Sequence, residues 1–384
     1  MSVPLPHSIA APSQRPPTAH TGLWFDKFCH QWTDAWKLDS PAKLKWIQTV
    51  TGSKIGDKQL LAEHSDRLTD LAQGGGGEAH FFKTVGRFAT GLGREHPIEN
   101  GFVWHPTLGV PCLPGPSVKG LVRAWAKTWT GAMEDHLTRI FGPGDLRVAP
   151  ASTGSVIFYD AIPIKPVQLA ADVMTPHYGP YYEDKSGNTA PGDWHSPVPI
   201  PFLTVADGQS FLFALAPRSS SALDRNDCIT AAKWLEEALR ELGAGAKTAV
   251  GYGRFVPDAE AVAAFKKAEA AAAATAHKAA QKAAFTASLA AYSPLAQELM
   301  QVARDQKWET DGEAFKRPKV VEHWLGRLET DPHPDAITAL RRLMDLHYPG
   351  LLANPDKAEG RKNKPVFKPR WIALAKRLNA LRTP

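Results

Sequence analysis

The feature that most constrains the fold is a glycine-rich loop, residues 243–255, with the sequence GAGAKTAVGYGRF. The segment before it carries apolar residues at helical spacing, namely Cys228, Ala231, Ala232, Leu235, Leu239 and Leu242. A helix therefore leads into the loop, and the residues after it predict a strand. A dinucleotide-binding fingerprint requires the opposite order. A Walker A loop requires glycine where Ala246 precedes Lys247. The sequence thus excludes both kinds of nucleotide-binding loop.

The elements around this loop predict a mixed α+β domain. A strand-rich stretch is expected over 79–90, a helix from about Ser117 to Trp129, and strands over 155–164, 201–205 and 208–216. The last two are expected to pair through a turn at Asp207-Gly208. The resulting order, strand–helix–strand–strand–helix–strand, is typical of a ferredoxin-like (RRM-like) domain and would bring the glycine-rich loop beside the first strand.

The flanking segments predict further helices and a division into five parts. Aromatic residues recur at three- and four-residue steps between Leu23 and Val50, which favours one amphipathic helix, and Gly74–Gly77 reads as a flexible loop. The alanine-rich stretch Ala259–Ala291 predicts a solvated helix. We expect a disordered arm (1–20), an N-terminal helical segment (21–77), the ferredoxin-like domain (78–257), a helical linker (258–293) and a basic, all-helical domain (294–384).

Composition limits the function classes. Net charge is +6 with an isoelectric point near 9.1, which permits a nucleic-acid partner without requiring one. The three cysteines form no CxxC pair, so neither a disulfide framework nor a thiolate zinc site is expected. We find no cluster of metal-ligating residues and expect no cofactor. No stretch approaches the roughly 18–20 apolar residues of a membrane-spanning helix, so the interpretation is a soluble, cytoplasmic protein.

The stretch Arg87–Arg123 carries the first candidate binding site. A glycine pair, Gly91 and Gly93, is followed by a long loop and a predicted helix start near Ser117. Lys119 and Arg123 lie four residues apart and share one helical face. A helix N-terminus with unpaired amides and nearby cations can hold a phosphate. The alternative is an ordinary helix start, with Ser117 as N-cap and two solvated cations.

The glycine-rich loop is the second candidate, because a flexible backbone with two cations can follow a phosphodiester chain. Its alternative is a tight helix-to-strand turn, which would need one glycine rather than four. Together the two stretches predict an RNA-binding surface formed by Arg87, Arg94, Ser117, Lys119, Arg123, Gly243, Gly245, Lys247, Gly251, Gly253 and Arg254.

Catalytic candidates are few. His96 or His105 could act as a general base on a ribose hydroxyl, but each precedes a proline and could equally fix the shape of its loop. An aromatic insertion, residues 174–201, could stack splayed bases or form a protein interface.

Three linked blocks add a family resemblance. They read GLGREHPIENG at 91–101, HPTLGVP at 105–111 and LPGPSVKG at 113–120. With the GxGxxxxxGxGRF loop they resemble the RAMP superfamily of CRISPR proteins, and within it the sixth RAMP subunit of type III-B (Cmr) effector complexes. The resemblance covers about 80–256 well and 20–50 loosely. It implies a subunit that caps the backbone of related RAMP subunits near the 3′ end of the guide RNA, with guide and target RNA as partners.

The resemblance also implies a role without catalysis. In such complexes target cleavage is attributed to an aspartate in the first loop of a different RAMP subunit, whereas the loop here offers Glu95 and Glu99. We therefore expect no enzyme activity. The alternative is a metal-independent RAMP endoribonuclease that processes guide precursors. The extension 258–384 lies outside the shared core, and no function is transferred to it.

Overall fold

The computed structural model describes residues 12, 14–33, 35, 37–144, 147, 151–315, 317–359 and 364–381. The chain forms two compact units, residues 1–267 and 268–384. Most of the predicted disordered arm, residues 1–11 and 13, lies outside the described residues. Residues 14–20 are ordered, and the Nδ1 atom of His20 accepts a hydrogen bond from the amide of Leu23 at the start of the first helix.

The N-terminal segment contains three short helices where the sequence predicted one helix and a loop. They are α1 (Thr21–Lys27), α2 (Ser40–Gln48) and α3 (Lys58–Gly74). The prediction of a continuous helix over 23–50 is wrong because Asp39 caps a new helix, accepting from the amide of Ala42, and Pro41 sits in its first turn. Helix α3 was missed, although Leu61, Leu68 and Ala72 bury one of its faces.

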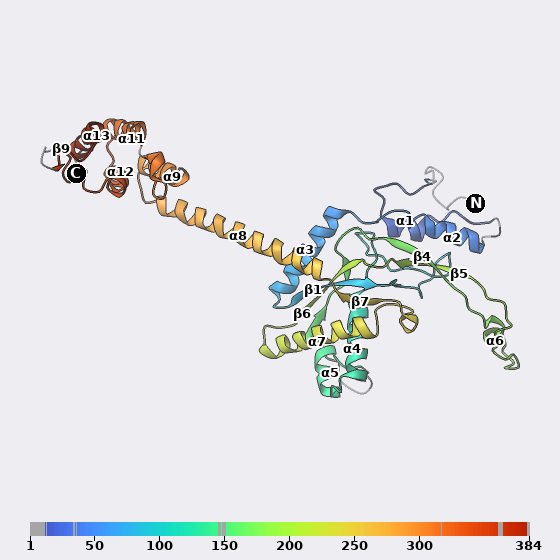
Figure 1. The fold of residues 1–384 in the computed structure, drawn as a ribbon. Coiled ribbons are helices and arrows are strands. Elements are labelled where there is room, and N and C mark those ends of the chain that lie inside the picture. Colours follow the sequence, from blue (N-terminus) through green and yellow to red (C-terminus); the bar gives the residue numbers. More distant parts are fainter. Residues whose placement is uncertain are drawn as a thin grey trace. The chain divides into compact units, whose positions relative to one another are not determined.

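The main sheet of the first unit is antiparallel and centred on β1 (Figure 1). Its strand order is β2-β6-β1-β7, and β3 also pairs with β6. The strands are β1 (Glu78–Val85), β2 (Val156–Phe158), β3 (Ile162–Pro163), β6 (Ser210–Pro217) and β7 (Arg254–Pro257). Helices α4 (Gly115–Trp129) and α7 (Ala222–Glu241) pack against each other, and α7 also contacts β2, β6 and β7. The α5 helix (Glu134–Phe141) lies against both helices.

Two strand predictions are corrected. The single strand over 155–164 is divided into β2 and β3, because the residues between them turn to contact the start of α4. The predicted pair at Asp207-Gly208 is also wrong. Strand β5 (Ile200–Val205) pairs with β4 (Leu169–Met174) in a separate two-stranded sheet, while both edges of β6 are occupied by β1, β2 and β3. The insertion, with α6 (Gly179–Glu183), is the distal connection of the β4–β5 ribbon (Figure 1).

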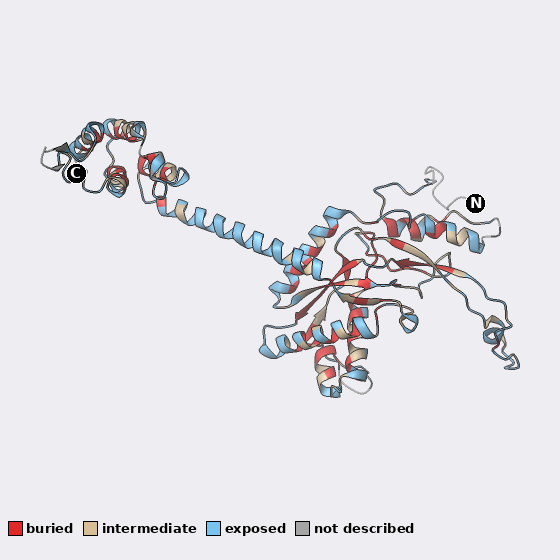
Figure 2. Ribbon diagram, viewed as in Figure 1, coloured by how far each residue is buried: buried red, intermediate tan, exposed pale blue. Residues whose placement is uncertain are grey.

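The core of the first unit contains many aromatic rings among its aliphatic residues and lies around the strands (Figure 2). The Phe255 ring lies edge-on to three other buried rings, those of Phe88, Phe211 and Phe213, with centroid distances of 5.3–5.7 Å. Edge-to-face contacts of this kind add to the burial of apolar area. Phe88 and Phe255 border the glycine-rich loop in space, so this cluster fixes the position of the candidate site.

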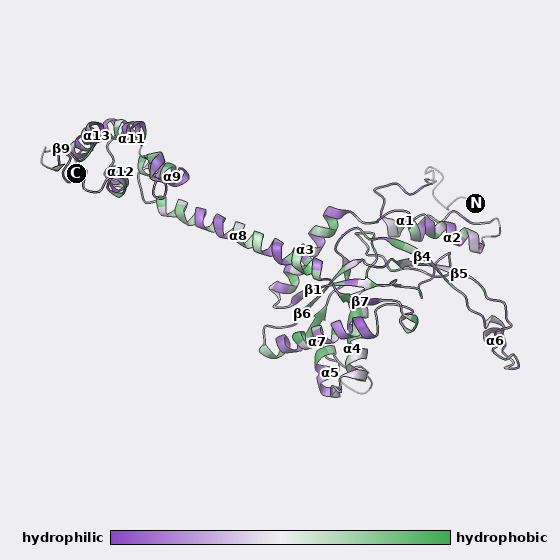
Figure 3. Ribbon diagram, viewed as in Figure 1, coloured by the Kyte–Doolittle hydropathy of each residue, from purple (hydrophilic) through white to green (hydrophobic). Residues whose placement is uncertain are grey.

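The second unit is mostly helical. Helix α8 (Ala259–Leu289) begins in the first unit and is largely exposed, with hydrophilic residues recurring along its length (Figure 3). It is followed by α9 (Pro294–Asp305), α10 (Gly312–Phe315), α11 (Pro318–Thr330), α12 (Pro334–His347) and α13 (Pro369–Ala380). The apolar residues of α11, α12 and α13 form one buried cluster. The all-helical prediction is corrected by a short hairpin, β8 (Ala358–Glu359) with β9 (Lys364–Pro365).

Candidate nucleic-acid interface

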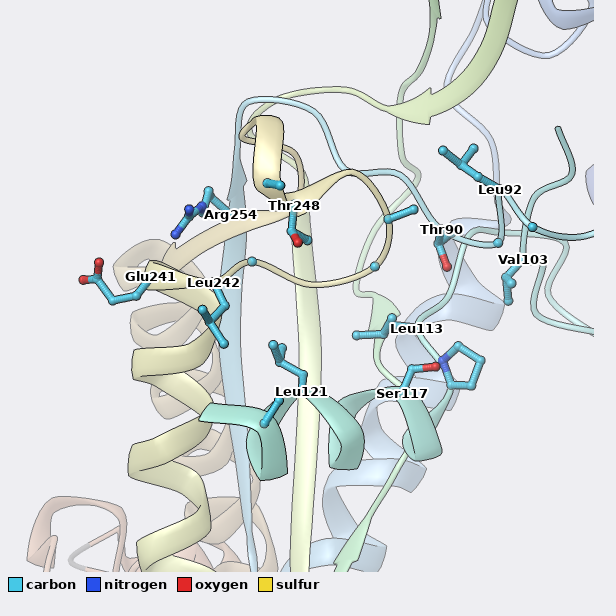
Figure 4. Close-up of a pocket in the computed structure, with 18 residues that line it drawn as sticks. Thr90, Leu92, Val103, Leu113, Ser117, Leu121, Glu241, Leu242, Thr248 and Arg254 are labelled. Atoms are coloured by element: carbon cyan, nitrogen blue, oxygen red, sulfur yellow. The ribbon is translucent and has the colours of Figure 1, made fainter. Parts of the chain in front are cut away.

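A groove of about 750 Å³ lies between the glycine-rich loop, residues 90–93 and helix α4 (Figure 4). Ser117, Leu121 and Ala124 contribute one face of α4, and residues 241–254 provide the opposite wall. Glycine and alanine form much of the wall that residues 241–254 provide, and apolar side chains, among them Leu92 and Leu121, form much of the rest. Two stretches that are 150 residues apart in sequence thus form one surface, as the sequence predicted for the loop and the first strand.

Backbone hydrogen bonds hold the loop in place. The amide of Ala246 donates to the carbonyl of Ala89 (2.8 Å), and the amide of Gly253 donates to the carbonyl of Arg87 (2.8 Å). Within the loop, the amide of Ala244 donates to the carbonyl of Gly253 (2.7 Å). The loop is therefore an extension of the sheet edge and not a free flap.

All four glycines are required by the backbone itself. Their φ angles are 79°, 83°, 95° and 73° at Gly243, Gly245, Gly251 and Gly253. In this region a Cβ atom is strained. A Cβ at Gly245 would lie 2.2 Å from the carbonyl oxygen of Ala89, and one at Gly253 would lie 1.9 Å from that of Ala244. The argument that a turn here needs one glycine is therefore wrong, and the glycines alone do not indicate a ligand.

The start of α4 is not an open anion site. The amide of Gly115 donates to the Asp160 carboxylate (2.6 Å), and the amides of Ser117 and Val118 donate to the carbonyl of Pro114 (2.8 and 3.0 Å). Pro114 is the N-cap, so Ser117 lies inside the first turn and does not cap the helix. The carboxylate occupies the position that a phosphate would take. This corrects the expectation of unpaired amides at this terminus.

The structure separates the predicted cations into two groups. Arg254 lines the groove together with Ser117, Gly243 and Gly245. At 100° per residue, Lys119 and Arg123 lie on the opposite side of α4 from the groove-lining residues. There Arg123 donates to the carbonyl of Gly142 (3.3 Å). Burial, followed by the positive charges of Arg123 and Arg218, lowers the pKa of Lys119.

Two further predicted residues, Arg87 and Lys247, lie near the groove without lining it. Arg87 forms an ion pair with Asp172 (2.6 Å), and the hydroxyl of Tyr252 donates to the same carboxylate (2.5 Å). Burial of Asp172 acts to raise its pKa, but the hydrogen bonds from Tyr252 and Arg87 outweigh it, and the pKa is lowered. The ammonium group of Lys247 lies 5.7 Å from the centroid of the Phe202 ring. These contacts connect the glycine-rich loop to the β4–β5 ribbon.

Arg94 and Gly251 remain exposed at the periphery. The Arg94 backbone closes the loop that follows Gly91, since its amide donates to the carbonyl of Gly91 (3.0 Å) and its carbonyl accepts from Gly101 (2.9 Å).

The two histidines have structural partners. The His96 side chain is buried, its Nε2 lies 3.1 Å from the carbonyl of Phe25, and its Nδ1 accepts from the amide of Ile98. The Nδ1 of His105 accepts from the amides of Thr107 and Leu108. Burial lowers the pKa of both rings. These contacts match the structural interpretation that the sequence left open, in which each histidine fixes the shape of its loop.

Sequence reasoning missed three residues that organise this surface: Asp160, Asp172 and Tyr252. Asp160 caps α4 from 45 positions away, and Asp172 meets Tyr252 across 80 positions. Residues this far apart show no local sequence pattern that would predict their contact. Tyr252 alone carried a signal, because it lies between two of the loop glycines.

Among the described residues, no three His, Cys, Asp or Glu side chains are grouped so as to hold a metal ion.

Within the same residues, none of the helices has both the length and the apolar composition that a bilayer crossing requires.

The comparisons with known proteins fit this architecture. The first unit is a sheet domain whose glycine-rich loop pairs with the segment after its first strand. Residues 68–256, which include this domain, match the RAMP superfamily. The chain is 33% identical over 261 residues to the CRISPR system Cmr subunit Cmr6 of Pyrococcus furiosus, covering 52% of this chain and 72% of that protein. The chain therefore belongs to the Cmr6 family within the RAMP superfamily.

Solved structures are also similar. A chain in the cryo-EM structure of the Type III-B Cmr-beta bound to cognate target RNA is 23% identical, with a TM-score of 0.44, covering 56% of this chain and 71% of that one. The crystal structure of Cmr6 from Pyrococcus furiosus is 30% identical, with a TM-score of 0.31, covering 47% of this chain and 98% of that one.

Two glycine substitutions test the account of the loop. Gly251→Ala meets no atom within 4 Å, so it should cost only the left-handed backbone strain, about 1–2 kcal/mol of unfolding free energy. Gly253→Ala carries the same strain and also displaces the carbonyl of Ala244, which should cost roughly 1–3 kcal/mol more through lost hydrogen bonds. Equilibrium urea denaturation followed by tryptophan fluorescence measures both. Equal losses for the two variants would contradict the close packing of Gly253.

Proposed function

We propose that this chain is a non-catalytic, RNA-binding subunit of a type III-B CRISPR effector complex in the cytoplasm. Membership of the Cmr6 family supports the assignment to such a complex, since the relative is named as a Cmr subunit. The observation that carries the RNA-binding proposal is the groove between the glycine-rich loop and α4, with Arg254 on its wall and Lys247 in the same loop. On this account the core is a ferredoxin-like domain, and guide RNA is its direct ligand.

The lining explains how such a groove would hold RNA. Glycine and alanine leave room for a ribose–phosphate chain, Arg254 can contact a phosphate, and apolar side chains such as that of Leu121 can pack against the sugars. Bases that pair with a target need no contact with the protein. Glu241 also lines the groove and offsets the charge of Arg254, so the groove lining carries no net charge. The groove therefore favours positioning of a strand over strong binding by itself. Other RAMP subunits would complete the site on either side.

The Lys119–Arg123 pair can be compared directly with the two cations of the glycine-rich loop. It carries the same charge as Lys247 and Arg254 but lies on the other side of α4 from the groove. We infer that Lys247 and Arg254 contact RNA. Lys119 and Arg123, both predicted from sequence as RNA-binding, are inferred to act in the packing around α4, where Arg123 donates to the carbonyl of Gly142.

The test is co-purification with the other RAMP subunits and a guide RNA. Wild-type chain should recover both. Lys247→Gln/Arg254→Gln should still assemble but retain less RNA, and the slope of log affinity against log salt should fall by roughly 1.4, at about 0.7 per lost single-strand contact. Lys119→Gln/Arg123→Gln is the charge-matched control. If the control loses RNA and the groove variant does not, the site is misassigned. If wild type recovers neither subunits nor RNA, the proposed function is wrong.

The endoribonuclease alternative is tested separately. Purified chain incubated with CRISPR-repeat RNA in a chelator should give no specific cleavage, because both candidate histidines use ring nitrogens to hold their loops. Gel analysis of end-labelled RNA measures this. Specific cleavage that disappears in His96→Gln or His105→Gln would establish the enzyme and overturn the non-catalytic proposal.

A further inference from the structure

The net positive charge of the chain comes from its second unit. Residues 268–384 contain 19 Lys and Arg against 13 Asp and Glu, whereas residues 1–267 contain 26 of each. The whole formal charge of +6 therefore belongs to the C-terminal unit. That unit lies beyond the residues matched by the RAMP superfamily, 68–256. Residues 268–384 are thus the part of the chain whose net charge is best suited to attract an anion, and the family match assigns them no function.

This unit contains a pocket of about 390 Å³, formed by the end of α8, the end of α9 and one side of α12. Such a volume lies in the range of about 300–1,000 Å³ that is usual for small-ligand sites. Its floor is apolar, and Ala303 and Leu343 on it are buried. Phe285 and Tyr292 add two aromatic rings, and the Tyr292 side is open to solvent, with 41% of the residue exposed.

Cations stand at the rim of this apolar floor. Arg304 lies over the Phe285 ring, 4.2 Å from its centroid, so its guanidinium plane is oriented by the aromatic face. Lys307 follows the last turn of α9 with a φ of 55°, and the bond from the amide of Trp308 to the carbonyl of Ala303 (2.7 Å) fixes that turn. Among the described residues, Lys307 has no acidic partner.

The acidic residues of the pocket are already engaged. Asp335 accepts from the amide (2.5 Å) and the hydroxyl (2.7 Å) of Ser293. Glu309 pairs with Arg342 at 3.3 Å. The pocket lining holds three cations, those of Arg304, Lys307 and Arg342, against the two carboxylates, so one net positive charge remains to attract an anion beside the apolar floor.

We propose that this pocket binds a nucleotide unit, with the base against the apolar floor and Tyr292, and the phosphate on Arg304 and Lys307. Aromatic and guanidinium planes are the usual platforms for unpaired bases, and paired cations suit a phosphate. The same chemistry is offered by a free nucleoside monophosphate and by one nucleotide of a single strand. The pocket volume of about 390 Å³ is that of a small-ligand site, which favours this ligand over an acidic peptide. The site is independent of the groove in the first unit.

Binding is measured on the full-length chain with two probes: 5′-AMP by calorimetry, and a labelled single-stranded RNA hexamer by fluorescence anisotropy. Arg304→Gln/Lys307→Gln should weaken at least one probe roughly tenfold or more, since charge-assisted contacts are lost. Both side chains are exposed, so the variant should fold normally. Arg317→Gln/Lys319→Gln removes the same charge at the start of α11, outside the pocket lining, and should change affinity far less.

A second variant keeps the charges and fills the space. Ala339→Phe, on the pocket side of α12, should also weaken binding. Loss of the AMP signal alone identifies a free nucleotide as the ligand, and loss of the hexamer signal alone identifies a strand; either supports the site. The proposal is overturned if neither probe responds to Arg304→Gln/Lys307→Gln or to Ala339→Phe, or if an acidic peptide binds this pocket and the nucleotides do not. Hexamer binding that depends only on Lys247 and Arg254 would overturn this site and leave the proposed function intact.

Discussion

The candidate interface depends on the backbone pairing between the glycine-rich loop and the segment after β1. Two amide-to-carbonyl bonds, from Ala246 to Ala89 and from Gly253 to Arg87, bring residues from opposite ends of the domain into one surface. Each bond contributes about 0.5–1.5 kcal/mol net, but leaving such groups buried without partners costs more. Gly245 and Gly253 are required by the close approach of these backbones, because a Cβ at either position would overlap a carbonyl oxygen. The wall of the groove, and the reach of Tyr252 to Asp172, follow in turn.

Much of this could be predicted from order and periodicity. The apolar pattern predicted the helix before the glycine-rich loop and the strand after it. The predicted order of strands and helices then placed this loop beside the first strand. The pairing of β5 could not be predicted in this way. The turn at Asp207-Gly208 suits a hairpin of β5 with β6. However, β1 and β2, which are distant in sequence, pair with β6 on its two edges, so β5 pairs with β4 instead. The missed cap of α4 has the same cause, because Asp160 acts across 45 residues.

The two units divide the chemistry between them. The first has no net charge, and its cations are partly engaged: Arg87 with Asp172, and Arg123 with the carbonyl of Gly142. Under the proposed function, a surface of this kind would order a strand through shape and backbone contacts. The second carries the excess charge and a pocket with an aromatic wall. Electrostatic attraction of RNA, which depends on net charge and falls with salt, would then belong mainly to the C-terminal unit.

The most direct test is amide hydrogen exchange on the chain, free and assembled with guide RNA and the other RAMP subunits. If the groove is the RNA contact, peptides covering 89–93 and 243–254 should gain protection together. That gain should be lost when the RNA is digested while the subunits remain assembled. Protection unchanged after RNA digestion, or absent from both peptides, would contradict the account.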